Sequence, residues 1–173
     1  MTNQNIPKKI LYWYDNNKRA LPWRKKVSKK KQDYFTLVSE FMLQQTQVKT
    51  VIPYFEKFIK EFPNLKSLAK SSDHKILKNW EGLGYYSRAR NLKKTAIKLL
   101  KDYKGELPED IETLKSLPGI GEYTSRSILA IAHNKPYIPM DGNVERILKR
   151  VFLLKTDYEL SLIHISEPTR RWW

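Results

Sequence analysis

The sequence predicts an all-α fold. Apolar residues recur at spacings of three and four along most of the chain, and no run alternates strictly enough to indicate a β-strand. The 40% hydrophobic composition is sufficient for a packed core. A chain of 173 residues has the length of one domain, or of one domain and part of another.

The composition is strongly basic and contains no cysteine. Lys and Arg total 33 against 18 Asp and Glu, a formal charge of +15. This balance indicates a polyanionic partner, more simply a nucleic acid than an anionic membrane surface. Without cysteine, these residues offer no disulfide framework, zinc ribbon or thiolate-held iron–sulfur cluster, so we expect no metal site. No window approaches the ~20 apolar residues of a membrane span, and the N-terminus carries no export signal, so we expect a cytoplasmic protein with no membrane partner.

Three helices are expected in the first part of the chain. The first begins near Ile6, with Pro7 in its first turn, and a lysine-rich loop follows it. Asp33 is expected to cap the second helix, in which Glu40 lies at the edge of the apolar stripe. Pro53 is expected to kink or divide the third helix. The apolar positions that define the three are Ile6, Ile10, Trp13 and Tyr14, then Tyr34, Leu37, Val38, Phe41 and Met42, then Val48, Val51, Phe55, Phe58 and Phe62.

Three further helices are expected between residues 73 and 117. A short one follows Asp73 and ends at the glycine-rich turn 82–84. The next runs from about Tyr86 to Gly105, and glycine at that position is a typical C-terminal signal. Pro108 is expected to open the third.

A glycine-rich turn over residues 117–121 separates this last helix from another, which runs through Thr124, Ile128 and Ala132. Glycine permits a close backbone approach, and the N-terminus of the following helix presents unpaired N–H groups and a positive dipole end. A phosphate fits there without any side chain, and in so basic a chain we expect DNA-backbone contact. The alternative is an ordinary corner between two helices.

A final helix is expected over Val144, Ile147, Leu148, Val151 and Phe152, and the periodicity stops beyond about Leu160. Residues 161–173 have no helical period and resemble translated sequencing-adapter sequence, so we expect an artefactual tail there.

Two carboxylates far apart in the sequence are candidates for acid and charge-stabilising roles. Cleavage of an N-glycosidic bond requires protonation of the base and stabilisation of an oxocarbenium-like sugar, and one acid and one carboxylate suffice. Glu40 and Asp141 offer this pair. The alternatives are a charge on a helix surface for Glu40 and a helix cap over Asn143 and Val144 for Asp141.

Five sequence blocks together resemble one family. LPWR (21–24), SEFMLQQTQV (39–48), GLGYYSRARNL (82–92), LPGIGEYT (117–124) and MDGNVERIL (140–148) look like the MutY-type adenine DNA glycosylases of the helix-hairpin-helix superfamily, also called the endonuclease III superfamily. The resemblance covers roughly residues 5–155, but only the first part of a full family member. It implies the superfamily's all-α fold, with a six-helix barrel lobe and an incomplete second lobe.

The resemblance also implies an activity, which is hydrolytic removal of adenine mispaired with 8-oxoguanine or guanine during base excision repair. Glu40 is then the general acid that protonates adenine N7, and Asp141 stabilises the sugar cation. Tyr123 occupies the position of the Schiff-base lysine of endonuclease III-like relatives, which implies a monofunctional enzyme. Asn143 helps to orient Asp141 and the water.

Adenine must leave the duplex to be reached, and the resemblance assigns residues to this step. Gln45 and Tyr85 wedge into the stack, with Gln44 near them. Trp23, Arg24 and Leu43 line the adenine pocket, and Arg88 is expected at a phosphate. The hairpin residues are Pro118, Gly119, Ile120 and Gly121. For Trp80 we favour core packing.

By resemblance, residues 1–24 form the N-terminal helix and basic loop of the second lobe, and 25–134 the helical catalytic domain, with the helix-hairpin-helix at about 108–133. Residues 135–160 form the aspartate loop and the start of the incomplete second lobe. Full-length relatives usually carry a [4Fe-4S] cluster, which this chain cannot ligate. We expect a monomer that binds double-stranded DNA containing A:8-oxoguanine or A:G mispairs, at the bacterial nucleoid. The alternatives are a mismatch thymine or uracil glycosylase of the same superfamily and an inactive DNA-binding helical fragment.

Overall fold

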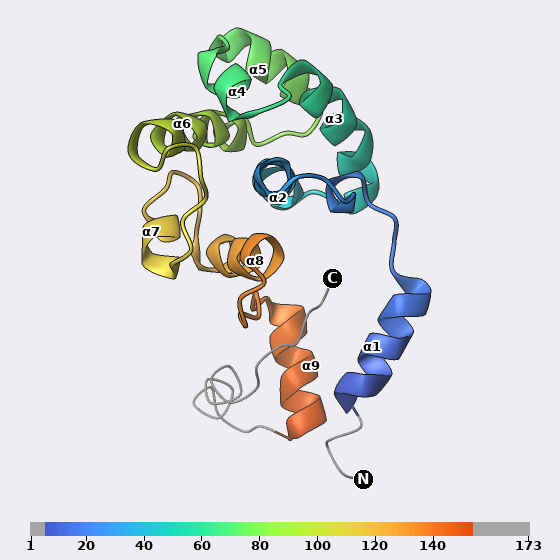
Figure 1. Cartoon of the computed structure of the whole chain (residues 1–173). Helices are drawn as coiled ribbons and strands as arrows, with labels where there is room; N and C mark the ends of the chain where they lie inside the picture. Colours follow the sequence, from blue (N-terminus) through green and yellow to red (C-terminus); the bar gives the residue numbers. More distant parts are fainter. Residues whose placement is uncertain (1–5, 154–173) are drawn as a thin grey trace.

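A computed structural model describes residues 6–153 and confirms the all-α prediction, because every regular element within these residues is helical (Figure 1). The elements follow in the order α1 (Ile6–Asn17), the short 3-10 helix η2 (Pro22–Arg24), α2 (Lys29–Leu43), α3 (Val48–Glu61), α4 (Leu65–Lys70), α5 (Asp73–Trp80), α6 (Ser87–Asp102), α7 (Ile111–Lys115), α8 (Glu122–His133) and α9 (Gly142–Phe152). The expected tail at 161–173 lies outside the described residues.

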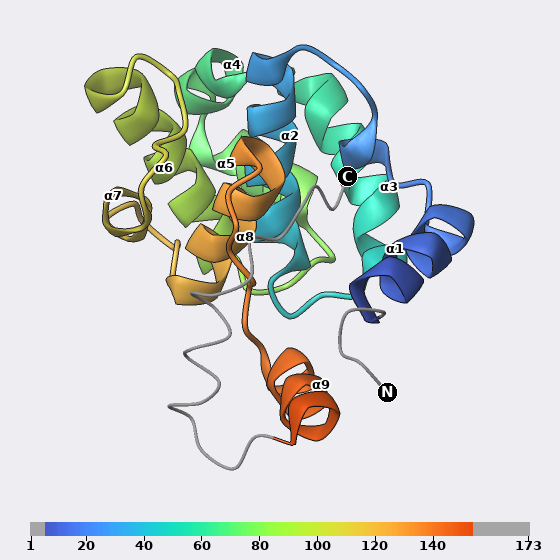
Figure 2. The ribbon, with the colours of Figure 1, turned by 60° about the horizontal axis from the view of Figure 1, so that its bottom comes forward.

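Helix α2 is the centre of the fold. It contacts η2, α3, α6 and α8, and Figures 1 and 2 show it between these helices. All residues from Tyr34 to Met42 are buried, so the helix has no solvent face over this stretch. Glu40, predicted at the edge of a stripe, is therefore inside the protein, with 9% of its surface exposed.

Aromatic side chains join η2, α3 and α5 in the core. Trp23 meets Phe55 edge-on with ring centroids 5.2 Å apart, and Phe58 meets Trp80 in the same way at 5.9 Å. Edge-to-face pairs of this kind are each worth about 0.5–1.5 kcal/mol beyond the area they bury. Trp80 is fully buried, which confirms the core-packing interpretation.

Several helix boundaries differ from the prediction because caps depend on local hydrogen bonds. Helix α2 begins at Lys29, so Asp33 lies inside it and accepts a hydrogen bond from Lys29 Nζ at 2.7 Å. Pro53 lies within α3, which continues through it undivided. Helix α7 begins after Asp110, whose carboxylate accepts a hydrogen bond from the Thr113 amide at 2.8 Å, and not at Pro108.

Helix α4 is an element that the sequence analysis missed. It has six residues and begins with a capping box, in which Asn64 Oδ1 accepts a hydrogen bond from the Ser67 amide and Ser67 Oγ accepts one from the Asn64 amide. Six residues are fewer than two helical turns, so the 3.6-residue period cannot establish itself.

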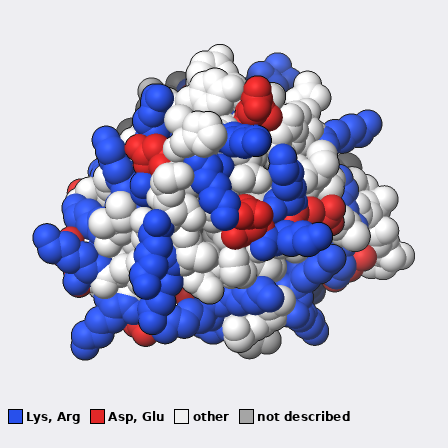
Figure 3. Space-filling model, turned by 90° about the horizontal axis from the view of Figure 1, so that it is seen from above, with Lys and Arg blue, Asp and Glu red and all other residues white. Residues whose placement is uncertain are grey.

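Helices α1 and α9 lie at the periphery and bury no residue in the described part of the chain (Figure 1). Each exposes large apolar side chains: Tyr12 and Trp13 on α1, and Ile147 and Val151 on α9. Across residues 6–153, no helix combines the length and the apolar character that crossing a bilayer requires. Lys and Arg outnumber Asp and Glu on the face seen in Figure 3.

Candidate active site and nucleic-acid interface

Three turns meet beside the C-terminal end of α2. They are residues 44–47 after α2, 81–86 between α5 and α6, and 116–121 between α7 and α8. Gln44 joins the first to the third, because its Nε2 donates to the Gly119 carbonyl at 3.2 Å and lies 3.3 Å from Thr124 Oγ1. The structure therefore brings the predicted DNA-contact segments onto one part of the surface.

The turn of the hairpin requires glycine at one position. Gly119 has a φ of +80°, and a Cβ atom there would lie 2.8 Å from Asn91 Cβ and 2.9 Å from Phe41 Cε1. Ile120 is buried, and the Pro118 carbonyl accepts a hydrogen bond from Thr95 Oγ1 at 2.8 Å, so the turn is held on both sides. Gly121 then precedes α8 without a side-chain cap. The first amides of α8 consequently have no capping side chain from this position.

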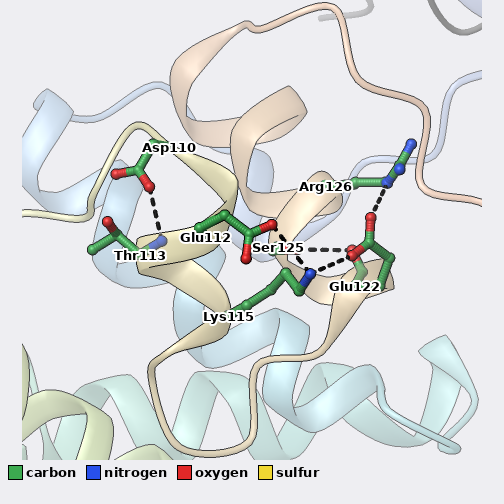
Figure 4. A network of polar contacts seen from close by, with 7 residues as sticks. All are labelled: Asp110, Glu112, Thr113, Lys115, Glu122, Ser125 and Arg126. Carbon is green, nitrogen blue, oxygen red and sulfur yellow. Dashed lines mark hydrogen bonds and ion pairs between the residues drawn. The ribbon is translucent and has the colours of Figure 1, made fainter.

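Ion pairs connect the two helices of the hairpin (Figure 4). Lys115 on α7 lies 3.1 Å from Glu122 and 3.3 Å from Glu112, and Arg126 Nε lies 2.7 Å from Glu122. Hydrogen bonds from Arg126 and Lys115 lower the pKa of Glu122 below its usual value. The carboxylate in the first turn of α8 is thus ionised and held by two cations.

Glu40 combines burial with a raised pKa. Burial raises the pKa of this carboxyl group to about 7, although a hydrogen bond from Ser127 and the positive charge of Arg24 act to lower it. A carboxyl group with such a pKa is partly protonated at neutral pH, as a general acid must be. The alternative of a helix-surface charge is wrong for Glu40.

Ser127 is a site residue that sequence analysis missed. It is buried on α8, four residues after Tyr123, and its hydroxyl is a hydrogen-bond partner of Glu40. Residues four apart share one face of a helix. Because Tyr123 is a candidate site residue, this spacing of four was the sequence signal that could have identified Ser127.

Tyr123 lies within electrostatic range of both Glu40 and Asp141. Burial raises the pKa of the Tyr123 hydroxyl, and the negative charges of Glu40 and Asp141 raise it further. Asp141 precedes α9, and its Oδ1 accepts hydrogen bonds from the amides of Asn143 at 2.9 Å and Val144 at 2.8 Å. The helix-cap interpretation of Asp141 is therefore confirmed, and both bonds use only one of its carboxylate oxygens. The Asn143 side chain contacts Arg146 instead, at 2.7 Å.

The predicted wedge residues are both exposed. Gln45 and Tyr85 are accessible at the ends of their turns, and 63% of the Tyr85 surface is free. Both have positive φ, +58° for Gln45 and +47° for Tyr85. For residues other than glycine this conformation is uncommon and marks a locally constrained backbone.

Three other predicted residues occupy less accessible positions. Arg88 is 6% exposed and bonds to main-chain carbonyls, so the expected phosphate contact is wrong for its guanidinium. Trp23 lies in the core against Phe55, and Leu43 is half-buried against the core. Arg24, by contrast, is exposed at a cavity of about 890 Å³ between α1, η2 and α3, and its Nη1 donates to the Tyr14 hydroxyl at 3.1 Å.

The residues present do not fit an iron–sulfur cluster. The chain contains no cysteine, so none of the four thiolates of such a cluster comes from these 173 residues. Over the described range 6–153, no group of three or more His, Asp and Glu side chains is placed to hold a metal ion.

Over the described residues the protein is all-helical, with a glycine hairpin and a buried carboxyl group near it. These are features of a helical DNA-repair enzyme, and comparison with known proteins agrees. Residues 38–171 match the family model of the HhH-GPD superfamily base excision DNA repair proteins, and the chain belongs to this family.

Proteins named adenine DNA glycosylase are among its most similar relatives. The chain is 43% identical to the rat protein over 159 residues, which cover 89% of this chain and 31% of that protein. It is 46% identical over 153 residues to the protein of Buchnera aphidicola subsp. Baizongia pistaciae, with 88% and 42% covered. The chain thus spans about a third to two-fifths of the length of these relatives.

Solved structures resemble the fold closely. A thermostable thymine-DNA glycosylase matches with a TM-score of 0.74 and 26% identity, over 83% of this chain and 64% of that one. A non-covalent endonuclease III–DNA complex matches with a TM-score of 0.73 and 20% identity, over 98% and 79%.

Proposed function

We propose that this chain carries the catalytic lobe of a monofunctional DNA glycosylase, which removes adenine mispaired with 8-oxoguanine or guanine. The observation that carries the proposal is the buried Glu40 carboxyl group, whose pKa is about 7, together with Tyr123, which lies within electrostatic range of both Glu40 and Asp141. The 43–46% identity to relatives named adenine DNA glycosylase supports adenine as the base.

In the proposed reaction, protonated Glu40 donates its proton to adenine N7. The bond between C1′ and N9 then breaks, and its electron pair leaves with the base. Asp141 stabilises the oxocarbenium-like sugar with its carboxylate. Water adds to C1′ and loses a proton to the Glu40 carboxylate, which restores the acid.

Tyr123 supports a hydrolytic outcome. Its side chain has no amine to form a Schiff base with C1′, so water is the nucleophile. Burial, and after it the negative charges of Glu40 and Asp141, raise its pKa, which keeps the hydroxyl protonated and able to donate a hydrogen bond. The backbone N–H of Asn143 donates a hydrogen bond to Asp141 Oδ1 and so orients this carboxylate.

We propose that DNA lies across the three turns. The uncapped start of α8, with Pro118, Gly119, Ile120 and Gly121, receives a backbone phosphate. Gln45 and Tyr85 enter the stack when adenine is extruded, and Gln44 lies beside them and braces the hairpin. We propose Arg24, which lines the cavity of about 890 Å³, and Leu43 as residues of the base pocket. Trp23 supports this region from the core.

The domain organisation belongs to the same proposal. Residues 25–134 form the catalytic lobe, and 1–24 together with 135–160 belong to a second lobe. The support is that α1 and α9 bury no residue while exposing apolar side chains. We propose that the protein works as a monomer on chromosomal DNA in the cytoplasm.

A second candidate is a mismatch thymine or uracil glycosylase. The thymine-DNA glycosylase structure, at 26% identity and a TM-score of 0.74, favours it. The third possibility is a DNA-binding module without activity, for which the basic charge and the hairpin would suffice.

A panel of labelled duplexes separates the three. Each duplex carries one A:8-oxoguanine, A:G, T:G or U:G pair, with A:T as the control, and base release is measured with enzyme in excess. Release of adenine from the first two supports the proposal. Release confined to T:G or U:G supports the second candidate, and salt-dependent binding without release of any base supports the third.

A further inference from the structure

The Arg88 side chain joins two of the three turns from inside the protein. Its Nη1 donates to the Met42 carbonyl at 2.9 Å and to the carbonyl of Gln44, and its Nη2 donates to those of Leu83 at 2.9 Å and Gly84 at 3.1 Å. The guanidinium is also 5.6 Å from the centre of the Tyr85 ring. One side chain therefore contacts the backbone beside both proposed wedge residues.

These bonds satisfy groups that the helices leave unpaired. The carbonyls of Met42 and Gln44 belong to the last turn and the cap of α2, where no following amide of the helix donates a hydrogen bond to them. A cation at this end also interacts favourably with the helix dipole. The planar guanidinium holds its donors in a fixed fork and reaches two separate turns at once, whereas an ammonium group is a compact point charge without that fork.

The two turns hold backbone conformations that need such support. Gln45 and Tyr85 have φ values of +58° and +47°, and each follows directly on a residue whose carbonyl Arg88 binds. A left-handed conformation is unfavourable for a residue other than glycine, and it persists when the surroundings fix it. Both side chains are exposed, so packing does not supply that constraint.

We propose that Arg88 is a positioning residue for base extrusion. It fixes the relative position of the two turns that contain Gln45 and Tyr85, so that both side chains enter the duplex together. The inference rests on the proposed function, because it assumes that these residues act as wedges. Arg88 itself touches neither the base nor a phosphate.

The test compares Arg88→Lys with the wild-type chain and with Arg90→Lys. Arg90 lies on the same helix with an exposed side chain, so the control makes the same substitution outside the turns. The duplex carries 2-aminopurine next to the mispaired adenine, so its fluorescence reports unstacking while base release is followed at enzyme excess. We expect Arg88→Lys to lower the unstacking signal and the release rate at least about tenfold, with overall DNA affinity kept within about twofold.

Two further variants separate positioning from general stability. Gly84→Ala places a methyl group in open space but disfavours the φ of +69°, so it should disturb the turn without disturbing the core and give the same loss. In a Gln45→Ala, Tyr85→Ala background, Arg88→Lys should cost almost nothing more, because its targets are gone.

The inference is overturned if Arg88→Lys and Gly84→Ala behave like Arg90→Lys, or if the Arg88→Lys loss is the same in the background without wedges. A wild-type chain that gives neither unstacking nor release would refute the proposed function, and this inference with it. Wild-type release with normal Arg88→Lys behaviour would refute the inference alone.

Discussion

At the residue scale, the chemistry depends on how Glu40 keeps its proton. Burial of the Glu40 carboxyl group disfavours its charged form, while Ser127 and Arg24 favour that form, and the resulting pKa is about 7. A fully apolar surrounding would raise the pKa further and leave a weaker acid. The surroundings of Glu40 therefore set both the strength of the acid and the pH range in which it works.

Glu40 is expected to lower the free energy of unfolding at high pH. Its pKa in the folded chain, about 7, lies above the ordinary value of 4.5. The burial penalty is absent below pH 4.5, where both states are protonated, and it grows as pH rises towards 7. Glu40→Gln should therefore raise the free energy of unfolding by about 2–3 kcal/mol at pH 8 relative to its effect at pH 4. Urea unfolding of both chains at the two pH values measures this, and an equal effect at both would contradict the raised pKa.

Ser127→Ala is expected to shift the pH dependence of base release upwards. The Ser127 hydrogen bond favours ionised Glu40, so its loss raises the Glu40 pKa and extends protonation to higher pH. The measurement is the single-turnover rate at pH values from about 5 to about 9. Ser125→Ala is the control, because that buried hydroxyl bonds instead to the Glu122 carbonyl at 2.8 Å. A shift to lower pH, or the same shift in both variants, would argue against the role of Ser127.

At the element scale, the hairpin depends on one glycine more than on the other. Gly119→Ala places a Cβ atom against Asn91 and Phe41 at a positive φ, whereas Gly121→Ala meets nothing within 4 Å. We expect Gly119→Ala to lower the free energy of unfolding by about 1–3 kcal/mol and to weaken DNA binding. Gly121→Ala should change stability little. Thermal unfolding and DNA titration of the two variants check this. Equal losses of stability and affinity would show that neither the space around the added Cβ atom nor the φ angle determines the effect.

Glu122 is expected to oppose DNA binding weakly. Its carboxylate lies in the first turn of α8, where the proposal places a phosphate, and it occupies Lys115 and Arg126. Glu122→Gln removes the negative charge and with it one ion-pair partner each of Lys115 and Arg126. We therefore expect about twofold to fivefold tighter binding at low salt and a smaller gain at high salt. Glu112→Gln, which removes the other ion-pair partner of Lys115 but lies on α7, is the control. Equal affinities for wild type and Glu122→Gln would place the phosphate elsewhere.

Long periodic elements could be predicted from the sequence, and local caps could not. Helices α6 and α8 show their 3.6-residue stripes over many residues, and Gly105 and the 117–121 turn mark their limits. Asp33 looked like a cap, yet α2 starts earlier, after Ser28. The residue types of Ser28 and Asp33 do not determine where α2 begins, because the start depends on how the helix packs on its neighbours.

At the scale of the whole molecule, separation in the sequence limited the prediction of the site. Glu40 was found as a candidate from its motif, and its burial follows from helices that enclose α2 on several sides. The inward position of Arg88 and the bond of Ser127 to Glu40 both depend on contacts between distant segments. No local pattern of charge or periodicity reports such contacts.

The central claim is that Glu40 acts as the acid in adenine release. The most direct measurement is the single-turnover release of adenine from a duplex with one A:8-oxoguanine pair, for wild type and Glu40→Gln, with an A:T duplex as the control. We expect release from the mispair by the wild-type chain, falling as pH rises through about 7, and none by a Glu40→Gln chain that still folds and binds DNA. Release by Glu40→Gln at the wild-type rate would contradict it.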